Sequence, residues 1–296
     1  MRERGSNKSF QINDDECRRL VDSIAKDNSI FFHNVIIRKE TATKFERIWN
    51  CKGIQNTFEH FRKQHVMDNT PYFLNQISQL YINGDDQCNK IKREDMRYVP
   101  SWDDYLRVRD QTTGVVTYTI TSKVQNRNWM FRLIDVGGQK SERKKWVNVF
   151  HDVGVVVYVM SLNAYDQMSN DDPRVKCFDE AFDVFRQVAS NPVFQSTDFF
   201  LFLNKIDLFE EKIKDVPFTL FDSSFDDSLK NDPTGVIQYV KARYKAIWND
   251  CPEEWQEKRA LFFHLTCSVN TSMMQSTIAS TNVVLIKRKM QKASIL

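Results

Sequence analysis

Apolar side chains in the first hundred residues recur at spacings of three and four, the pattern of amphipathic helices. No stretch before Pro100 alternates convincingly between apolar and polar residues. Helices are predicted over residues 14–37, from 45 to a stop near Gly53, over 54–61 and over 70–81. We therefore expect an all-helical domain over residues 11–100, preceded by a disordered or remnant terminus over residues 1–10.

After Pro100 the pattern changes to strands that alternate with helices. Residues 115–124 alternate as a half-buried strand, and a polar turn over 125–128 leads into an apolar strand that ends at Asp135. Further strands are predicted over 154–162, 199–203 and 261–265, and further helices over 177–188, 237–248 and 277–290. This alternation predicts an α/β domain over residues 101–296, with a mostly parallel, helix-covered sheet.

Polar residues follow three of these predicted strands at the point where each strand ends. They are Asp135, the stretch Asn204–Asp207, and Thr266. Ligands of open α/β sheets bind at the carboxyl ends of the strands. The sequence therefore predicts a ligand site along that edge of the sheet.

Composition limits the class of protein. The formal net charge of +3 in 296 residues is too small to argue for a nucleic-acid partner. The six cysteines are scattered and form no C-x-x-C pair, which favours reduced thiols in a cytoplasmic protein. No apolar run approaches the length of about 18 residues that spans a bilayer, and we expect neither a signal peptide nor a myristoylation signal. We expect a soluble, cytoplasmic chain.

The first of the polar strand ends reads Asp135-Val136-Gly137-Gly138. A carboxylate at a strand tip can hold a metal ion through water, and a free N–H beyond it can meet a terminal phosphate. Two adjacent glycines let a ligand approach the backbone closely. A strand followed by an ordinary loose turn explains the same four residues.

Two further stretches carry side chains suited to nucleotide chemistry. Asn204-Lys205-Ile206-Asp207 offers a carboxylate that can accept hydrogen bonds from the N1–H and 2-amino group of guanine, although a plain loop is the alternative. The backbone N–H of Ser268, in the stretch Thr266–Thr271, could meet the guanine carbonyl. Residues 106–114 offer arginines for phosphate oxygens and a threonine hydroxyl for magnesium.

Four motifs in order, LRVRDQTTG, DVGGQKSERKKW, FLNKIDLFEEKI and TCSVNT, resemble those of the alpha subunit of a heterotrimeric G protein. The resemblance runs from about Phe10 to Leu296, and the helical portion shares it at RIWNCKGIQNTF and TPYFLNQI. It implies a Ras-like GTPase domain with an inserted all-helical domain. The implied cofactors are GTP or GDP and Mg²⁺.

The resemblance also implies residue roles. Arg109 and Gln139 would be catalytic, the first neutralising phosphoryl charge and the second orienting the attacking water. Thr112 would ligate Mg²⁺ directly, and Asp135 would hold it through water. The implied nucleotide contacts are Leu106, Arg107, Val108, Arg109, Asp110, Gln111, Thr112, Asp135, Val136, Gly137, Gly138, Gln139, Asn204, Lys205, Ile206, Asp207 and Ser268. Packing alone also explains Arg107 and Trp146.

Partners are implied in the same way. Lys140–Trp146 would be ordered by GTP and would face the beta-gamma dimer and an effector enzyme. The helix that ends KRKMQKASIL would contact a G-protein-coupled receptor. The chain would reach the cytoplasmic face of the plasma membrane only peripherally, through partners.

The sequence departs from the family pattern at its start. No G-x-x-x-x-G-K-[ST] phosphate loop occurs, and Arg2 and Asn7 occupy the glycine positions of the nearest match, RERGSNKS. We expect the first strand and this loop to be missing, which would leave the strands that end at Asp135 and Leu162 without a shared neighbour. Asn270 stands where the family usually has Asp.

Two other interpretations stay open on these grounds. The chain can be a catalytically defective interaction module that binds partners without GTP turnover. It can also be an incomplete copy of a longer alpha subunit.

Overall fold

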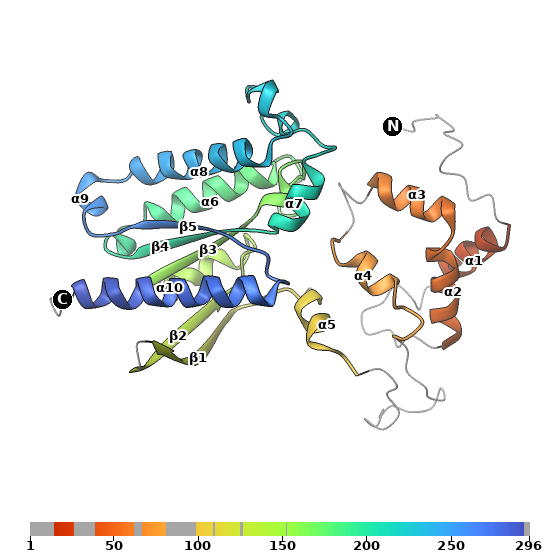
Figure 1. Cartoon of the computed structure of the whole chain (residues 1–296), viewed down its shortest axis with the longest axis horizontal. Helices are drawn as coiled ribbons and strands as arrows, with labels where there is room; N and C mark the ends of the chain where they lie inside the picture. The colour runs from red at the N-terminus through yellow and green to blue at the C-terminus, as the bar shows by residue number, and fades with distance from the viewer. Residues whose placement is uncertain are drawn as a thin grey trace. The chain divides into compact units, whose positions relative to one another are not determined.

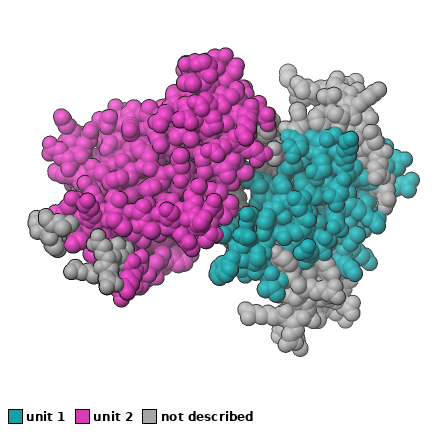
Figure 2. Space-filling model, viewed as in Figure 1, with its two compact units in different colours: residues 1–108 teal, residues 109–296 magenta. Residues whose placement is uncertain are grey.

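Figure 1 shows the computed structural model of the chain, which describes residues 15–26, 39–61, 67–80, 99–108, 110–124, 127–151 and 153–292. The chain divides into two compact units, residues 1–108 and 109–296 (Figure 2). The domain ranges expected from the sequence, with their boundary at residue 100, stay a prediction.

The described part of the first unit is helical. Its helices are α1 (Asp15–Lys26), α2 (Lys39–Trp49), α3 (Lys52–Phe61), α4 (Thr70–Leu74) and α5 (Trp102–Arg107). Trp49 at the end of α2 is buried, its ring packs edge-on against Phe58 at 4.9 Å, and its Nε1 donates to Asn75 Oδ1 at 2.6 Å. The amphipathic pattern of the sequence therefore turns an apolar face toward a small core.

The helix predicted over residues 70–81 is shorter in the structure. α4 ends at Leu74, and the next residues form tight turns closed by bonds such as Gln76 N–H to Phe73 O and Ile77 N–H to Leu74 O. Asn75 is the C-cap and accepts from the Trp49 indole, and asparagine favours helix ends over helix interiors. The apolar spacing continues past the point where the α-helix stops.

The second unit contains two separate sheets among its described residues. β1 (Val115–Val124) and β2 (Arg127–Val136) form an antiparallel hairpin, and β3 (Val155–Ser161), β4 (Asp198–Asn204) and β5 (Leu261–Leu265) form a parallel sheet in that order. The predicted parallel sheet is confirmed for these last three strands. β2 and β3 do not pair with each other, so each is an edge strand of its own sheet.

Helices cover both faces of the parallel sheet, with α6 (Cys177–Ala189) and α8 (Pro233–Asn249) on one side and α10 (Thr271–Lys292) on the other (Figure 1). Shorter elements are α7 (Ile206–Lys212), α9 (Glu253–Gln256) and the 3₁₀ helices η4 (Arg143–Asn148), η5 (Leu162–Ala164), η6 (Pro192–Phe194), η7 (Phe218–Leu220) and η8 (Asp227–Leu229). Among the described residues, no helix has both the length and the apolar character needed to cross a membrane.

Aromatic side chains build the core between α6, α8 and the sheet. The Tyr244 ring of α8 packs against Phe182 at 4.7 Å and against Phe185 at 4.9 Å, and Phe199 of β4 packs against Phe185 at 6.0 Å. All four side chains are buried. Because these rings fix the sheet against its helices, the loops at the ends of the strands have a rigid base.

α10 is fixed to the sheet by an ion pair. Arg288 donates from Nη2 to Asp198 Oδ1 at 2.7 Å and from Nε to Oδ2 at 3.1 Å, and Asp198 is buried at the first position of β4. The helix begins six residues before its predicted start, because Asn270 Oδ1 accepts the N–H of Met273 and caps it.

Candidate functional site

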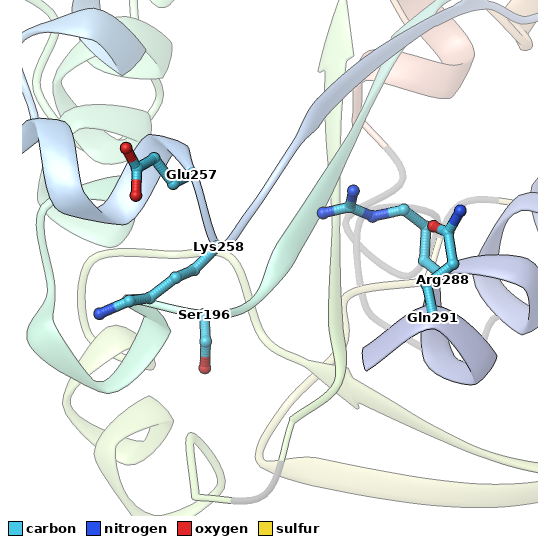
Figure 3. A pocket seen from close by; sticks show the side chains of 5 residues that line it. All are labelled: Ser196, Glu257, Lys258, Arg288 and Gln291. Atoms are coloured by element: carbon cyan, nitrogen blue, oxygen red, sulfur yellow. The ribbon is translucent and has the colours of Figure 1, made fainter. Parts of the chain in front are cut away.

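A pocket of about 380 Å³ lies beside the second half of α10. It is lined by Ser196, Glu257, Lys258, Arg288 and Gln291 (Figure 3). Arg288 is paired with Asp198, which begins β4, whereas the polar motif of that strand begins at its last residue, Asn204. The pocket therefore lies at the amino edge of the sheet and contains none of the predicted site residues.

At the opposite edge, Asn204 joins the ends of β4 and β5. Its Oδ1 accepts hydrogen bonds from Thr266 Oγ1 at 3.1 Å, Ser268 N at 3.1 Å and Ser268 Oγ at 3.0 Å. The N–H of Ile206 in turn donates to Thr266 O at 3.2 Å. The structure thus brings together two motifs that are separated by about sixty residues in the sequence. The Ser268 N–H, which we expected to meet a guanine carbonyl, donates to Asn204.

Lys205 and Asp207 follow at the start of α7. Lys205 has φ of +61°, the only positive φ of a non-glycine residue in the described part of the chain. Backbone in this region is strained for a side chain with a Cβ, and such residues cluster at functional sites. Asp207 is exposed in the first turn of the helix. Burial raises the pKa of the neighbouring Cys267 thiol, and the Asp207 carboxylate raises it further.

A second set of predicted site residues lies where β2 ends. Thr112 Oγ1 lies 3.4 Å from Asp135 Oδ2, and the N–H of Gly137 donates to Gly114 O at 3.2 Å. A Cβ on Gly137 would lie 2.6 Å from Thr112 O, so only glycine fits at this position. The close approach of the two segments brings the threonine hydroxyl and the aspartate carboxylate together. We call residues 110–114 the Thr112 loop and residues 137–146 the Gln139 segment.

The oxygens of Thr112 and Asp135 fit Mg²⁺. This ion prefers hydroxyl, carboxylate and water oxygens and keeps several of its waters, so one or two protein ligands suffice. The described residues contain no group of three or more His, Cys, Asp or Glu side chains that would hold a metal ion by themselves. An ion held here would take its remaining ligands from water or from a bound ligand.

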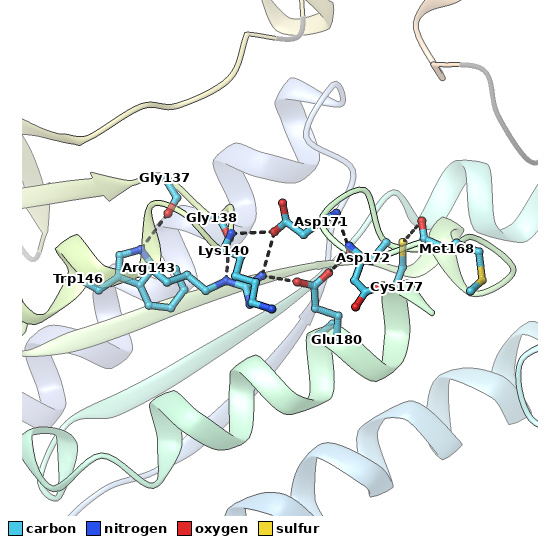
Figure 4. Close-up of polar contacts among 12 residues, drawn as sticks. Gly137, Gly138, Lys140, Arg143, Trp146, Met168, Asp171, Asp172, Cys177 and Glu180 are labelled. Carbon is cyan, nitrogen blue, oxygen red and sulfur yellow. Dashed lines mark hydrogen bonds and ion pairs between the residues drawn. The ribbon is translucent and has the colours of Figure 1, made fainter. Parts of the chain in front are cut away.

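The Gln139 segment folds back on its own glycines (Figure 4). Trp146 Nε1 donates to Gly137 O at 2.9 Å, and Arg143 Nε donates to Gly138 O at 3.1 Å. The Gln139 residue is exposed, and its carbonyl accepts the N–H groups of Glu142 and Arg143. A Cβ on Gly138 would meet nothing within 4 Å, so this position is open to a ligand.

Residues that the sequence reasoning missed fasten this segment to the loop after β3 and to α6 (Figure 4). Asp171 Oδ2 accepts the N–H of Lys140 at 2.7 Å, and Glu180 Oε1 lies 2.5 Å from Arg143 Nη2. Ser169 Oγ donates to the other oxygen of Glu180. No local pattern identifies these partners, because Glu180 is 37 residues from Arg143 in the sequence.

The remaining predicted residues are described by their own surroundings. Arg109 lies outside the described residues. Leu106, Arg107 and Val108 belong to the first unit, where the Arg107 guanidinium lies 4.4 Å from the centre of the Tyr72 ring and 3.4 Å from Asp103 Oδ1. Asp110 and Gln111 are exposed, Val136 is half-buried and Ile206 is buried.

The model of the G-protein alpha subunit family matches residues 1–285. The chain is 30% identical over 251 residues to the guanine nucleotide-binding protein alpha-15 subunit of Caenorhabditis elegans, covering 85% of this chain and 64% of the relative. It is 30% identical over 253 residues to the G(o) subunit alpha of the same species, covering 86% and 64%. It is 33% identical over 231 residues to the alpha-8 subunit of Caenorhabditis briggsae, covering 78% and 57%. The matches span less than two thirds of the length of these curated relatives.

Proposed function

The chain belongs to the G-protein alpha subunit family, and we propose that it is a guanine nucleotide-binding switch that hydrolyses GTP and transmits signals from G-protein-coupled receptors. Its fold class is the α/β Ras-like GTPase fold. The single observation that carries the proposal is the junction of the Asn204–Asp207 and Thr266–Ser268 motifs through the Asn204 side chain.

Asp207 is the residue that we assign to base recognition. Its exposed carboxylate can accept hydrogen bonds from the N1–H and 2-amino group of guanine, which adenine does not offer. Asn204 has its oxygen occupied by three donors, so its role is to hold the two loops in place. The alkyl stem of Lys205 can lie along the face of the base.

Thr112 and Asp135 are the residues that would hold Mg²⁺, the first directly and the second through water. Bound Mg²⁺ supplies positive charge that offsets the charge of the phosphates. Gly138 offers an N–H in an open position, suited to a terminal phosphate oxygen. Gln139 would orient the attacking water, and Arg109 would neutralise charge on the transferring group.

The same proposal assigns partners to two surfaces. Lys140–Trp146 would be ordered by GTP and released on hydrolysis, and would present one face to the beta-gamma dimer and another to an effector enzyme. The end of α10 would meet the receptor. The chain would then work at the cytoplasmic face of the plasma membrane through these partners.

Thermal unfolding of the full chain with Mg²⁺ and a non-hydrolysable GTP analogue tests nucleotide binding. A ligand at a hundredfold excess over its Kd stabilises the folded state by about 2.7 kcal/mol, which raises the midpoint by several degrees. We expect this rise with the GTP analogue and none with the matching ATP analogue. A cooperative transition that ignores both nucleotides would contradict the proposal and favour an interaction module that binds partners without turnover.

A further inference from the structure

We propose that Glu142 is a positioning residue that fastens the Thr112 loop to the Gln139 segment and so keeps Thr112 and Asp135 facing each other. The inference about Mg²⁺ rests on the proposed function, whereas the fastening itself does not. None of the catalytic, nucleotide-binding or Mg²⁺ roles proposed above involves Glu142, and its side chain is only 13% exposed although it lies in a highly charged stretch.

The Glu142 carboxylate reaches across to the other segment. Its Oε2 accepts the backbone N–H of Gly114 at 2.6 Å, 28 residues away in the sequence. The same carboxylate accepts from Lys145 Nζ at 2.8 Å through Oε1 and at 2.7 Å through Oε2. These two donors lower the pKa of Glu142, with Lys145 the larger cause, so the group stays charged. A charged acceptor on a backbone N–H makes a stronger bond than a neutral one.

The aliphatic part of Glu142 also packs at this junction. A Cβ on Gly137 would lie 2.8 Å from Glu142 Cγ and 2.6 Å from Thr112 O. The Glu142 side chain and the Thr112 backbone therefore lie against the same face of Gly137. Gly137 N–H to Gly114 O, at 3.2 Å, completes a closed set of contacts between the two segments.

This junction decides whether two ligands from different segments stay within reach of one ion. Thr112 is two residues before Gly114, and Asp135 is two residues before Gly137. Their side-chain oxygens are 3.4 Å apart, which is a weak contact by itself. A cation site made of two ligands requires outside support to hold them in place, and loss of such support typically weakens metal binding by about 10-fold to 100-fold.

Amide hydrogen exchange of the full chain without any ligand tests the fastening. We expect E142A to accelerate exchange of the Gly114 and Gly137 amides by about tenfold or more, because the junction then opens locally. E142Q keeps a carbonyl oxygen for the Gly114 N–H and should restore most of the protection. K145M, the matched control, removes the ion pair but leaves the Gly114 bond, and should stay close to wild type. Equal exchange in E142A and wild type would overturn the inference.

The Mg²⁺ dependence of thermal stability, measured with the GTP analogue bound, tests the positioning role. E142A should require about tenfold more Mg²⁺ for half of the full stabilisation, with E142Q and K145M near wild type. The control is thermal unfolding of E142A without ligand, where a cooperative transition shows that the variant folds. Faster exchange with an unchanged Mg²⁺ requirement would overturn the positioning role. A wild-type chain that ignores nucleotide and Mg²⁺ overturns the proposed function instead, and the exchange data then decide the fastening on their own.

Discussion

Arg143 and Glu180 form the closest charged contact between the Gln139 segment and α6, with Nη2 and Oε1 2.5 Å apart. Both side chains are largely shielded from water, at 21% and 23% exposed. Asp171 lies 3.6 Å from the same guanidinium nitrogen. The segment that carries Gln139 is therefore held to the core by a short network of charged groups.

Removing this contact should loosen the segment and lower stability. We expect R143A and E180A each to reduce the free energy of unfolding by about 1.5–3 kcal/mol, as for hydrogen bonds to charged groups, and the double variant to cost less than the sum. Urea unfolding of the wild type, the two single variants and the double variant gives the coupling energy between the two side chains. The matched control is Arg186–Asp183, an exposed pair at 53% and 62%, where the coupling should stay below about 1 kcal/mol. Equal coupling energies for the two pairs would contradict this prediction.

The adjacent glycines Gly137 and Gly138 should differ in their tolerance of an added methyl group. G137A forces a Cβ to within 2.6 Å of Thr112 O, so we expect a loss of about 1–3 kcal/mol in stability and faster exchange in the Thr112 loop. G138A adds its Cβ to open space and should unfold like wild type. Thermal unfolding of both variants checks this, and a G137A midpoint equal to that of G138A would argue against the close approach of the two segments.

Asp207 should decide which base is bound. D207N replaces an acceptor by an amide that also donates, so GTP binding should weaken by about 1–3 kcal/mol, the cost of leaving a hydrogen-bonding group unpaired. Xanthine carries a carbonyl where guanine carries its 2-amino group, so the xanthosine nucleotide should bind D207N better than wild type. Thermal shifts of wild type and D207N with each nucleotide show whether the preference changes from the guanosine to the xanthosine nucleotide. E210Q, an exposed change on the same helix, should alter neither.

Gln139 and Arg109 should affect turnover and spare binding. Q139L removes the group proposed to orient water, and R109C removes the positive charge proposed to stabilise the transferring phosphoryl group, for which losses of about 10³-fold are typical. Single-turnover release of phosphate from GTP gives the rate, and analogue-induced thermal shifts show that binding survives. Wild-type rates in either variant would remove that residue from the catalytic assignment.

His264 should make the stability of the sheet depend on pH. Burial beside the Phe200 ring, 5.8 Å away, lowers the pKa of His264 below its ordinary value of about 6.5. The unfolded chain then binds the proton more readily, so this contribution to stability is complete above about pH 6.5 and is lost as the pH falls from there toward the folded pKa. Urea unfolding between pH 7.5 and 5 measures the slope, and H264F should flatten it while keeping the ring contact.

Local sequence patterns were sufficient to predict the long helices and strands of the second unit and the strand ends at which the motifs lie. The Val115–Val124 strand follows from alternation, and the parallel strands follow from continuous apolar runs such as Phe199–Leu203. Chain order then predicts that Asn204 and Thr266 meet at one edge, because parallel strands end together. α5 and α7 were missed, since six or seven residues are too few for a helical period to stand out.

Only the tertiary structure decided how the segments are fastened. The partners of Gly114, Arg143 and Asp198 lie 28, 37 and 90 residues away, and no spacing rule links positions so far apart. The separation of the hairpin from the parallel sheet likewise depends on which strand edges meet. The sequence by itself determined which chemical groups this protein carries and at which strand ends they stand. Long-range packing determined which of them touch, because contact between distant segments depends on the shape of the whole core.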